Sequence, residues 1–143
     1  GNFVAELRKD LFCDFQVVLE GLDSPNCAVL DARSERRFKG LDPEPRPGVR
    51  SGHMPNAKNL PFPEVLNGGL LKSVSELQEI FVNLSLDHQD AIITSCGSGI
   101  TACILTLAAD VAGFSKLSVY DGSWAEWGLP GKLPVVSDLT NNN

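Results

Sequence analysis

Short runs of consecutive apolar residues alternate along the chain with stretches in which apolar residues recur every three or four positions. The runs at 26–31, 91–94 and 117–120 predict strands, and a weaker run at 57–60 ends at Pro61. Continuous apolar runs of this length are typical of strands that are buried on both faces, as in a parallel sheet.

The stretches with helical spacing lie between these runs. The predicted helices cover residues 14–22, about 75–84 (with Ser73 as an alternative start), 101–111 and 123–127. Asp14 is a candidate N-cap for the first helix, and Ser75-Glu76-Leu77-Gln78 fits a capping box for the second. Residues 101–111 are nearly all apolar, so we expect this helix to be buried on every side until Gly113 ends it.

Three parts of the chain are expected to lack regular structure. Segment 33–47 carries Pro43, Pro45 and Pro47, which predicts an extended or looped chain rather than a helix. The polar tail 136–143 is expected to be disordered, and residues 1–13 to form a lead-in. These boundaries leave one domain, at 14–135.

Strands that alternate with helices predict an α/β fold, with a mostly parallel sheet covered by helices on both faces. A chain of 143 residues can build one such domain around a substantial core. In open parallel sheets, binding sites form at the carboxyl ends of the strands. Residues 95–100, directly after the 91–94 strand, are therefore where we expect the chemistry.

Composition narrows the possible functions. The net charge of −6 disfavours a nucleic-acid or anionic-membrane surface, and no apolar stretch approaches the roughly 20 residues that span a bilayer. The four cysteines and two histidines fit no zinc spacing, so no metal is expected. A domain with 43% hydrophobic residues does not depend on disulfides. We therefore expect reduced thiols and a cytoplasmic protein, or a mitochondrial one in a eukaryote.

The segment Cys96-Gly97-Ser98-Gly99-Ile100-Thr101 joins a predicted buried strand to a predicted helix. Unpaired amides and the dipole at a helix N-terminus stabilise a thiolate, so Cys96 is a candidate nucleophile. Gly97 and Gly99 allow a tight loop around one sulfur, and the Ser98 hydroxyl can relay a proton. An ordinary buried cysteine before a turn is the alternative. Cys27 and Cys103 are expected to pack in the core, whereas the position of Cys13 leaves both roles open.

Five segments, in this order, resemble the C-terminal, catalytic rhodanese domain of 3-mercaptopyruvate sulfurtransferases. The resemblance extends over about residues 14 to 135, which is nearly the whole chain. The segments are Leu30-Asp31-Ala32-Arg33, Pro43-Glu44-Pro45-Arg46-Pro47-Gly48, Ser51-Gly52-His53-Met54-Pro55-Asn56-Ala57, Cys96-Gly97-Ser98-Gly99-Ile100-Thr101-Ala102 and Tyr120-Asp121-Gly122-Ser123-Trp124-Ala125-Glu126-Trp127-Gly128.

The resemblance implies a rhodanese-like fold, with a five-stranded parallel sheet and helices on both sides. It also implies that Cys96 carries a persulfide during turnover, with Ser98 assisting, and that no cofactor is needed. The remaining loop residues, Gly97, Gly99, Ile100 and Thr101, would bind the substrate. Arg37 and Arg46 match the arginines that hold the substrate carboxylate.

The donor implied is 3-mercaptopyruvate, because thiosulfate-specific members place basic residues in this loop, where the chain has Gly97 and Ser98. The acceptor would be a thiol, such as thioredoxin or a small thiol, or cyanide. Members usually also have an N-terminal rhodanese domain, which is missing from this sequence. A thiosulfate sulfurtransferase and a non-catalytic rhodanese module for recognition or regulation remain alternatives.

A cysteine phosphatase is the other enzyme class considered, and the residues around Cys96 do not fit it. A phosphatase built on the same fold would need an arginine at the position of Ala102 and usually a histidine at that of Ser95. Without a guanidinium in the loop, a phosphate dianion would be poorly held.

His53 is interpreted as a structural hydrogen-bonding residue, and Trp124 as mainly a core residue that could also line the pocket.

Overall fold

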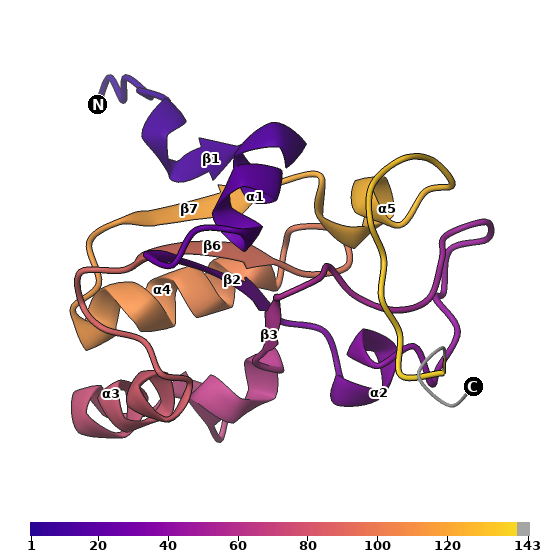
Figure 1. Cartoon of the computed structure of the whole chain (residues 1–143). Coiled ribbons are helices and arrows are strands. Elements are labelled where there is room, and N and C mark those ends of the chain that lie inside the picture. The colour runs from indigo at the N-terminus through magenta and orange to yellow at the C-terminus, as the bar shows by residue number, and fades with distance from the viewer. Residues whose placement is uncertain (140–143) are drawn as a thin grey trace.

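The computed structural model describes residues 1–139, and its centre is a sheet of five parallel strands (Figure 1). The strands stand in the order β1-β7-β6-β2-β3. Their bounds are β1 Phe12–Cys13, β2 Cys27–Asp31, β3 Lys58–Asn59, β6 Ala91–Ser95 and β7 Leu117–Tyr120. The predicted α/β fold with a parallel sheet is confirmed.

Helices cover both faces of this sheet. They are α1 Phe15–Leu22, α2 Glu35–Phe38, α3 Val74–Asn83, α4 Ala102–Ala112 and α5 Ser123–Trp127, with the short turns η1 Lys9–Leu11 and η2 Phe62–Val65 and the small antiparallel pair β4 Leu66–Asn67 and β5 Leu70–Leu71. In Figure 1, α4 lies on one side of the strands and α1 on the other. Between residues 1 and 139, none of these helices combines the length and apolar content that crossing a bilayer requires.

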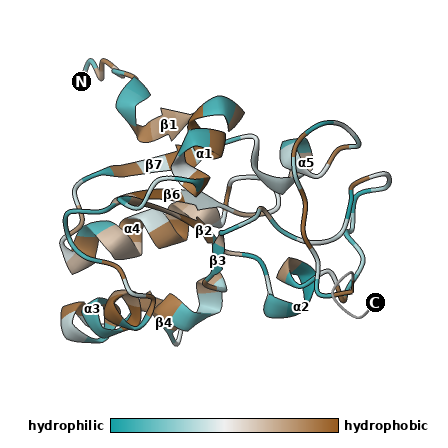
Figure 2. Cartoon of the chain, in the orientation of Figure 1, coloured by the Kyte–Doolittle hydropathy of each residue, from teal (hydrophilic) through white to brown (hydrophobic). Residues whose placement is uncertain are grey.

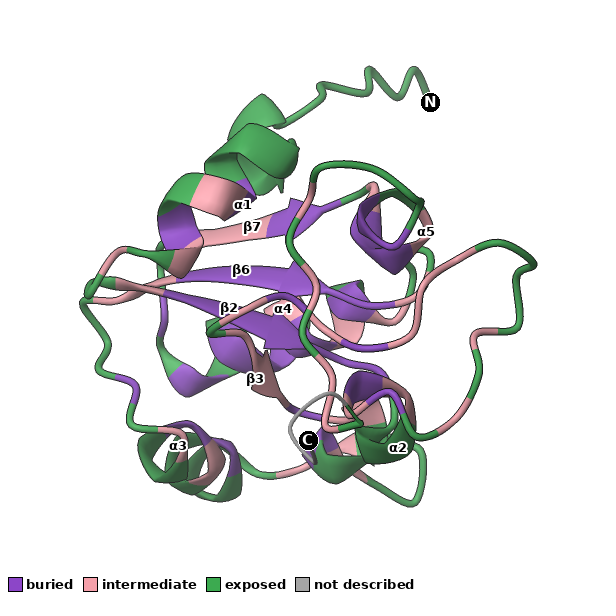
Figure 3. Ribbon diagram, turned by 45° about the vertical axis from the view of Figure 1, so that its right-hand side comes forward, coloured by how far each residue is buried: buried purple, intermediate pink, exposed green. Residues whose placement is uncertain are grey.

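Successive residues of β2 and β6 point to opposite faces, which builds two separate cores. Leu30 and Ile92 pack with residues of α3 and α4, whereas Val29 and Ile93 pack with α1 and α5. Both strands are buried on both sides, which explains their continuous apolar sequence. Figure 2 shows the hydrophobic character of the central strands, and Figure 3 their burial.

Helix α4 departs from the sequence-based expectation of burial on every side. Its buried stripe consists of Ala102, Leu105, Ala108, Ala109 and Ala112. Leu107 is 53% exposed, and Cys103 is exposed as well. The expectation was wrong because α4 lies in an outer layer, where only one side contacts the sheet and α3. Gly113 ends the helix with φ of 106°, as predicted.

Helix caps decide two further boundaries. Ser73, not Ser75, caps α3: its Oγ accepts from the Glu76 amide at 3.3 Å, and the Glu76 carboxylate accepts from the Ser73 amide at 2.9 Å. The segment 33–47 is not wholly looped, because Ser34 caps the short helix α2 and the prolines begin only at Pro43. Asp14 caps α1, as predicted.

The ordered chain extends on both sides of the expected domain 14–135. Strand β1 adds residues 12 and 13 to the sheet by pairing with β7, and a two-residue strand is too short to leave a pattern in the sequence. Beyond residue 135, Val136 and His53 exchange two backbone hydrogen bonds, and the Asp138 amide donates to the Lys39 carbonyl at 2.9 Å. Positions 136–139 of the expected disordered tail are therefore attached, and 140–143 lie outside the described residues.

Candidate active site

The loop that begins at Cys96 leaves the carboxyl end of β6, the middle strand of the sheet, and leads into α4. Cys96 is almost fully buried, with 1% of its surface exposed. Its Sγ accepts a hydrogen bond from the Gly99 amide at 2.9 Å. The loop thus directs a backbone N–H at the sulfur, in the segment that leads from β6 into α4.

The two glycines of the loop answer different demands. Gly99 has φ of 98°, and a Cβ there would lie 2.9 Å from the Asp121 carbonyl oxygen. Both the backbone conformation and the close approach therefore call for glycine. Gly97 has an ordinary φ, but a Cβ at this position would lie 3.1 Å from Nη2 of Arg37. Gly97 is what allows this arginine to lie against the loop.

Helix α5 holds the first part of the loop through its own unpaired amides. The Trp124 and Ala125 amides donate to the Cys96 and Gly97 carbonyls, each at 2.9 Å. Amides in the first turn of a helix have no partner within that helix, so the loop carbonyls satisfy them. The contact fixes the loop backbone on one side while the Gly99 amide reaches the sulfur on the other.

Ser123 anchors the same junction and was missed by the sequence analysis. It is fully buried, and its Oγ accepts from the Cys96 amide at 3.1 Å while donating to the Tyr120 carbonyl at 2.8 Å. Its φ of 50° is unusual for a residue other than glycine. A hydroxyl two residues after Asp121, at the carboxyl end of the strand beside β6, was the available signal.

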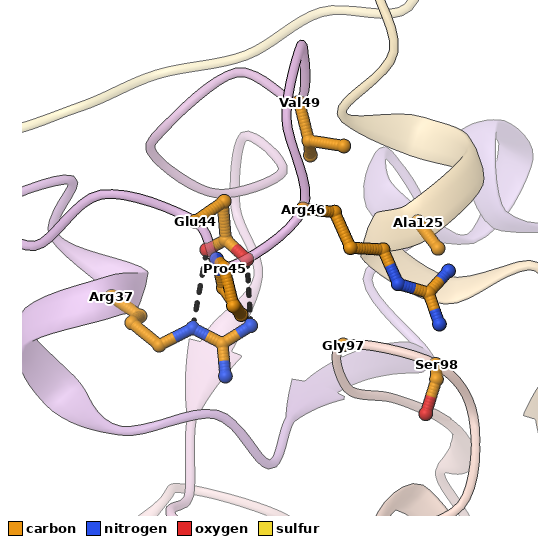
Figure 4. Close-up of a pocket in the computed structure, with 8 residues that line it drawn as sticks. All are labelled: Arg37, Glu44, Pro45, Arg46, Val49, Gly97, Ser98 and Ala125. Atoms are coloured by element: carbon orange, nitrogen blue, oxygen red, sulfur yellow. Dashed lines mark hydrogen bonds and ion pairs between the residues drawn. The ribbon is translucent and has the colours of Figure 1, made fainter.

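A cavity of about 250 Å³ opens beside the loop (Figure 4). It is lined by Arg37, Glu44, Pro45, Arg46, Val49, Gly97, Ser98 and Ala125. The structure thus brings both candidate arginines to the face of the cysteine loop. Cys96, Gly99, Ile100 and Thr101 do not line this cavity: Ile100 is 77% exposed, and Thr101 stands at the start of α4.

Ser98 lies on the cavity wall and is exposed, with its hydroxyl directed away from Arg46 in Figure 4. Within residues 1–139, no hydrogen bond joins this hydroxyl to Cys96 or to any other group. The hydroxyl is therefore free to meet a bound molecule or water. Arg46 is also exposed, and its guanidinium has no ion pair or hydrogen bond with the described residues.

Arg37, in contrast, is already paired. Its Nη2 lies 2.6 Å from Glu44 Oε2 and its Nε 3.3 Å from Oε1. The other side of Glu44 is bound by Arg33, whose Nη1 lies 2.8 Å from Oε1. Arg33 in turn forms a two-pronged ion pair with Asp31, and its guanidinium lies 4.2 Å from the centre of the Trp124 ring.

This ion-pair network extends from the cavity wall, at Arg37 and Glu44, into the buried interior, at Arg33 and Asp31. The side chains of Asp31, Arg33 and Glu44 are 2%, 1% and 4% exposed, whereas that of Arg37 is 28% exposed. Neither Arg33 nor Glu44 was among the residues for which the sequence predicted a role in the site. Buried charges require such partners, so the network holds the arginine segment in place.

The remaining candidate residues fall outside the cavity. The His53 ring stacks on Phe38 at 3.9 Å, and its Nδ1 lies 2.7 Å from the Phe38 carbonyl, an arrangement that fits a structural role. Trp124 is buried beneath Arg33 and does not line the cavity.

The other cysteines are poorly placed to act as nucleophiles in this cavity. Burial raises the pKa of the Cys13 and Cys27 thiols, which disfavours their thiolates. The expectation that Cys103 packs in the core is wrong: it is exposed on the outer side of α4, and its Sγ lies 3.6 Å from the Gly99 carbonyl. Cys96 is the cysteine whose sulfur receives an amide of the loop.

A parallel sheet whose middle strand leads into a loop that begins with a cysteine and ends at a helix N-terminus defines a class of α/β domains equipped for thiol chemistry. The model of the rhodanese-like domain matches residues 14–129. The chain belongs to the rhodanese family.

Named relatives agree with this assignment. The chain is 43% identical over 127 residues to the 3-mercaptopyruvate sulfurtransferase of Mus musculus, covering 88% of this chain and 43% of that protein. It is 37% identical over 137 residues to thiosulfate/3-mercaptopyruvate sulfurtransferase 1, mitochondrial, of Arabidopsis thaliana, covering 95% of this chain and 36% of that protein. This chain therefore spans less than half the length of either relative.

Among solved structures, the chain resembles the sulfur transferase subunit of yeast mitochondrial complex I. The TM-score is 0.81 at 37% identity, and the match covers 95% of this chain and 49% of the other. The resemblance confirms the rhodanese-like architecture over nearly the whole chain.

Proposed function

We propose that this domain transfers sulfur from 3-mercaptopyruvate to a thiol acceptor through a persulfide on Cys96. The observation that carries the proposal is the 2.9 Å hydrogen bond from the Gly99 amide to Cys96 Sγ, at a helix N-terminus beside a cavity with two arginines. A fixed backbone dipole at this place stabilises an anionic sulfur. The thiolate is the form of cysteine that attacks. The names of the family relatives support sulfur transfer as the reaction class.

Two features of the cavity support a carboxylate-bearing donor. Arg46 offers a guanidinium that no described residue occupies, and Arg37 keeps Nη1 free of ion pairs while Glu44 holds its other nitrogens. A guanidinium fork pairs well with a carboxylate. Positions 97 and 98 carry no positive side chain, so the loop itself lacks the cation that a thiosulfate dianion would favour.

The first half-reaction charges the cysteine. The Cys96 thiolate attacks the thiol sulfur of 3-mercaptopyruvate; the new S–S bond forms as the C–S bond breaks. The bonding electrons leave on carbon as the enolate of pyruvate, which takes a proton to give pyruvate. Ser98 is the hydroxyl that we propose to assist this proton movement, because it lies on the cavity wall without another partner.

The second half-reaction returns the free enzyme. An acceptor thiolate attacks the outer sulfur of the Cys96 persulfide, so that the acceptor leaves as a persulfide and the Cys96 thiolate re-forms. The Gly99 amide stabilises the sulfur that departs, just as it stabilised the one that attacked. Thioredoxin, a small thiol or cyanide fits this step, and neither metal nor organic cofactor takes part.

The remainder of the relatives' length is the basis for proposing a partner domain. The match with the Mus musculus protein leaves more than half of that protein uncovered. We propose that a second, N-terminal rhodanese domain completes the protein and covers the exposed cavity. We also propose a cytoplasmic or mitochondrial compartment, because a domain of this composition does not depend on disulfides.

The mass of the protein after exposure to 3-mercaptopyruvate tests the proposal. We expect a gain of one sulfur that thiols remove, and no gain in Cys96→Ser. Cys103→Ser is the matched control, since it removes an exposed thiol that also contacts Gly99. Loading by thiosulfate but not by 3-mercaptopyruvate would overturn the donor assignment. No loading by either donor would favour the non-catalytic module.

A further inference from the structure

The net charge of the side chains that line the cavity differs from what its two arginines alone would give. Three of its lining residues are ionisable: Arg37, Glu44 and Arg46. The two arginines suggest a doubly positive site, suited to any small anion. Glu44 lowers this positive charge, because its carboxylate also lines the cavity, beside Arg37 (Figure 4).

The charges within the buried ion-pair network cancel, and Arg46 lies outside that network. Asp31 neutralises Arg33 through a two-pronged contact with distances of 2.7 and 3.0 Å. Glu44 then pairs with Arg37 through a 2.6 Å contact, although it also touches Arg33. Two acids and two bases sum to zero, and Arg46 is the lining cation that has no ionic partner within residues 1–139. The cavity therefore carries one net positive charge.

We infer that Glu44 sets the charge selectivity of this site: by neutralising Arg37 it matches the cavity to a monoanion and discriminates against a dianion. Glu44 acts through Arg37 and is a positioning residue rather than a catalytic one. The inference rests on the proposed function, and names the feature that separates a carboxylate donor from thiosulfate. Selection between a monoanion and a dianion then depends on the wall that carries Arg37 and Glu44, as well as on the lack of cationic side chains at positions 97 and 98.

Burial makes the carboxylate effective in this role. The Glu44 side chain is 4% exposed, so water screens its charge poorly, and Arg37 holds it at hydrogen-bonding distance. Because Coulomb energy is proportional to the charge of the ligand, removing one negative charge from the wall favours a dianion about twice as strongly, in free energy, as a monoanion. The ratio of dianion to monoanion affinity is therefore the quantity to measure, because a loss of packing alone would not change it.

The test uses Glu44→Gln, which keeps the size of the side chain and an oxygen that can accept from Arg37. Both it and its parent carry Cys96→Ser, so that no turnover interferes, and binding of pyruvate and of sulfate is measured by calorimetry at constant ionic strength. We expect pyruvate affinity to rise about threefold and sulfate affinity about tenfold, following the proportionality to ligand charge. Asp42→Asn is the matched control: it removes one negative charge from the same segment at an exposed pair with Arg36, and should leave the ratio unchanged.

Equal changes in the two affinities, or no gain for sulfate, would overturn the inference. If Glu44→Gln does not fold, Arg37→Gln and the double variant Arg37→Gln/Glu44→Gln ask the same question. The single variant should lower the ratio of sulfate to pyruvate affinity, and the double variant, whose net charge equals that of the parent, should restore it. A double variant that stays as low as Arg37→Gln would also contradict the inference. Because the ligands are inert and Cys96 is absent, failure of persulfide loading would sink the proposed function without affecting this result.

Discussion

The two walls of the cavity are built by different physical means. The cysteine loop, residues 96–101, is shaped by backbone: a positive φ at Gly99, two carbonyls bound by α5 amides and one amide turned to the sulfur. The arginine segment, residues 33–46, is instead held by buried charges on side chains. One wall is thus fixed by backbone conformation and backbone hydrogen bonds, and the other by ion pairs between buried side chains.

This difference predicts different responses to mutation. Damage to the loop should reduce the chemical step while leaving the fold stable, because few side chains are involved. Damage to the buried ion pairs of the arginine segment should first reduce stability, because a buried charge that loses its partner is costly. Four substitutions test this contrast.

Arg33→Gln should have the largest effect. It leaves Asp31 and Glu44 buried with fewer partners, and removing one member of a buried ion pair costs about 3–5 kcal/mol. Urea unfolding followed by circular dichroism measures the loss. Arg36→Gln, at an exposed pair with Asp42, is the control and should cost at most about 1 kcal/mol. Equal losses in the two variants would show that burial does not give the network its importance.

Gly99→Ala should reduce the rate of Cys96 persulfide formation about 100-fold, because a misplaced reacting group commonly costs that much. The new Cβ would meet the Asp121 carbonyl at 2.9 Å and would strain a backbone with φ of 98°. Stopped-flow measurement of pyruvate release gives the rate. A normal rate in a protein that folds normally would show that the Gly99 amide is not needed at the sulfur.

Arg46→Gln should raise KM for 3-mercaptopyruvate about tenfold with little change in kcat, because it removes one charge-assisted contact to the carboxylate. Steady-state rates over a range of donor concentrations separate the two constants. Thermal unfolding should hardly change, since the Arg46 side chain has no hydrogen bond or ion pair within the described residues. A fall in kcat at constant KM would contradict a role in holding the donor.

Gly97→Ala should have the smallest effect, about threefold on kcat/KM, equivalent to less than the 1.4 kcal/mol of a tenfold change. Its Cβ would lie 3.1 Å from Arg37 Nη2, and that side-chain end can shift slightly. This substitution lies where the two walls meet. An effect as large as that of Gly99→Ala would mean that the position of Arg37 matters as much as the loop backbone.

The same contrast explains what the sequence could predict. The apolar runs and glycines reflect local backbone requirements, so strands such as β6, the cysteine loop and the end of α4 at Gly113 could be located. The exposed outer side of α4 could not, because an apolar residue such as Leu107 does not reveal which neighbours it lacks. Strand β1 pairs through only two residues and leaves no periodicity.

The candidate site followed the same division. The family motifs placed Cys96, Arg37 and Arg46 together, and the structure brings both arginines to the face of the cysteine loop. The roles of Glu44 and Ser123 depend on side-chain contacts made in the folded chain, with Arg33 and Arg37 for Glu44 and with the Cys96 amide for Ser123. Such contacts leave no spacing in the sequence, so only the folded structure could reveal them.

The central claim is that Cys96 accepts sulfur from 3-mercaptopyruvate before any acceptor is present. The amount of pyruvate released when excess donor is mixed with the protein alone tests this most directly. The account predicts a burst of one pyruvate for each Cys96, absent in Cys96→Ser and intact in Cys103→Ser. Pyruvate release without a burst, or a burst that survives in Cys96→Ser, would contradict it.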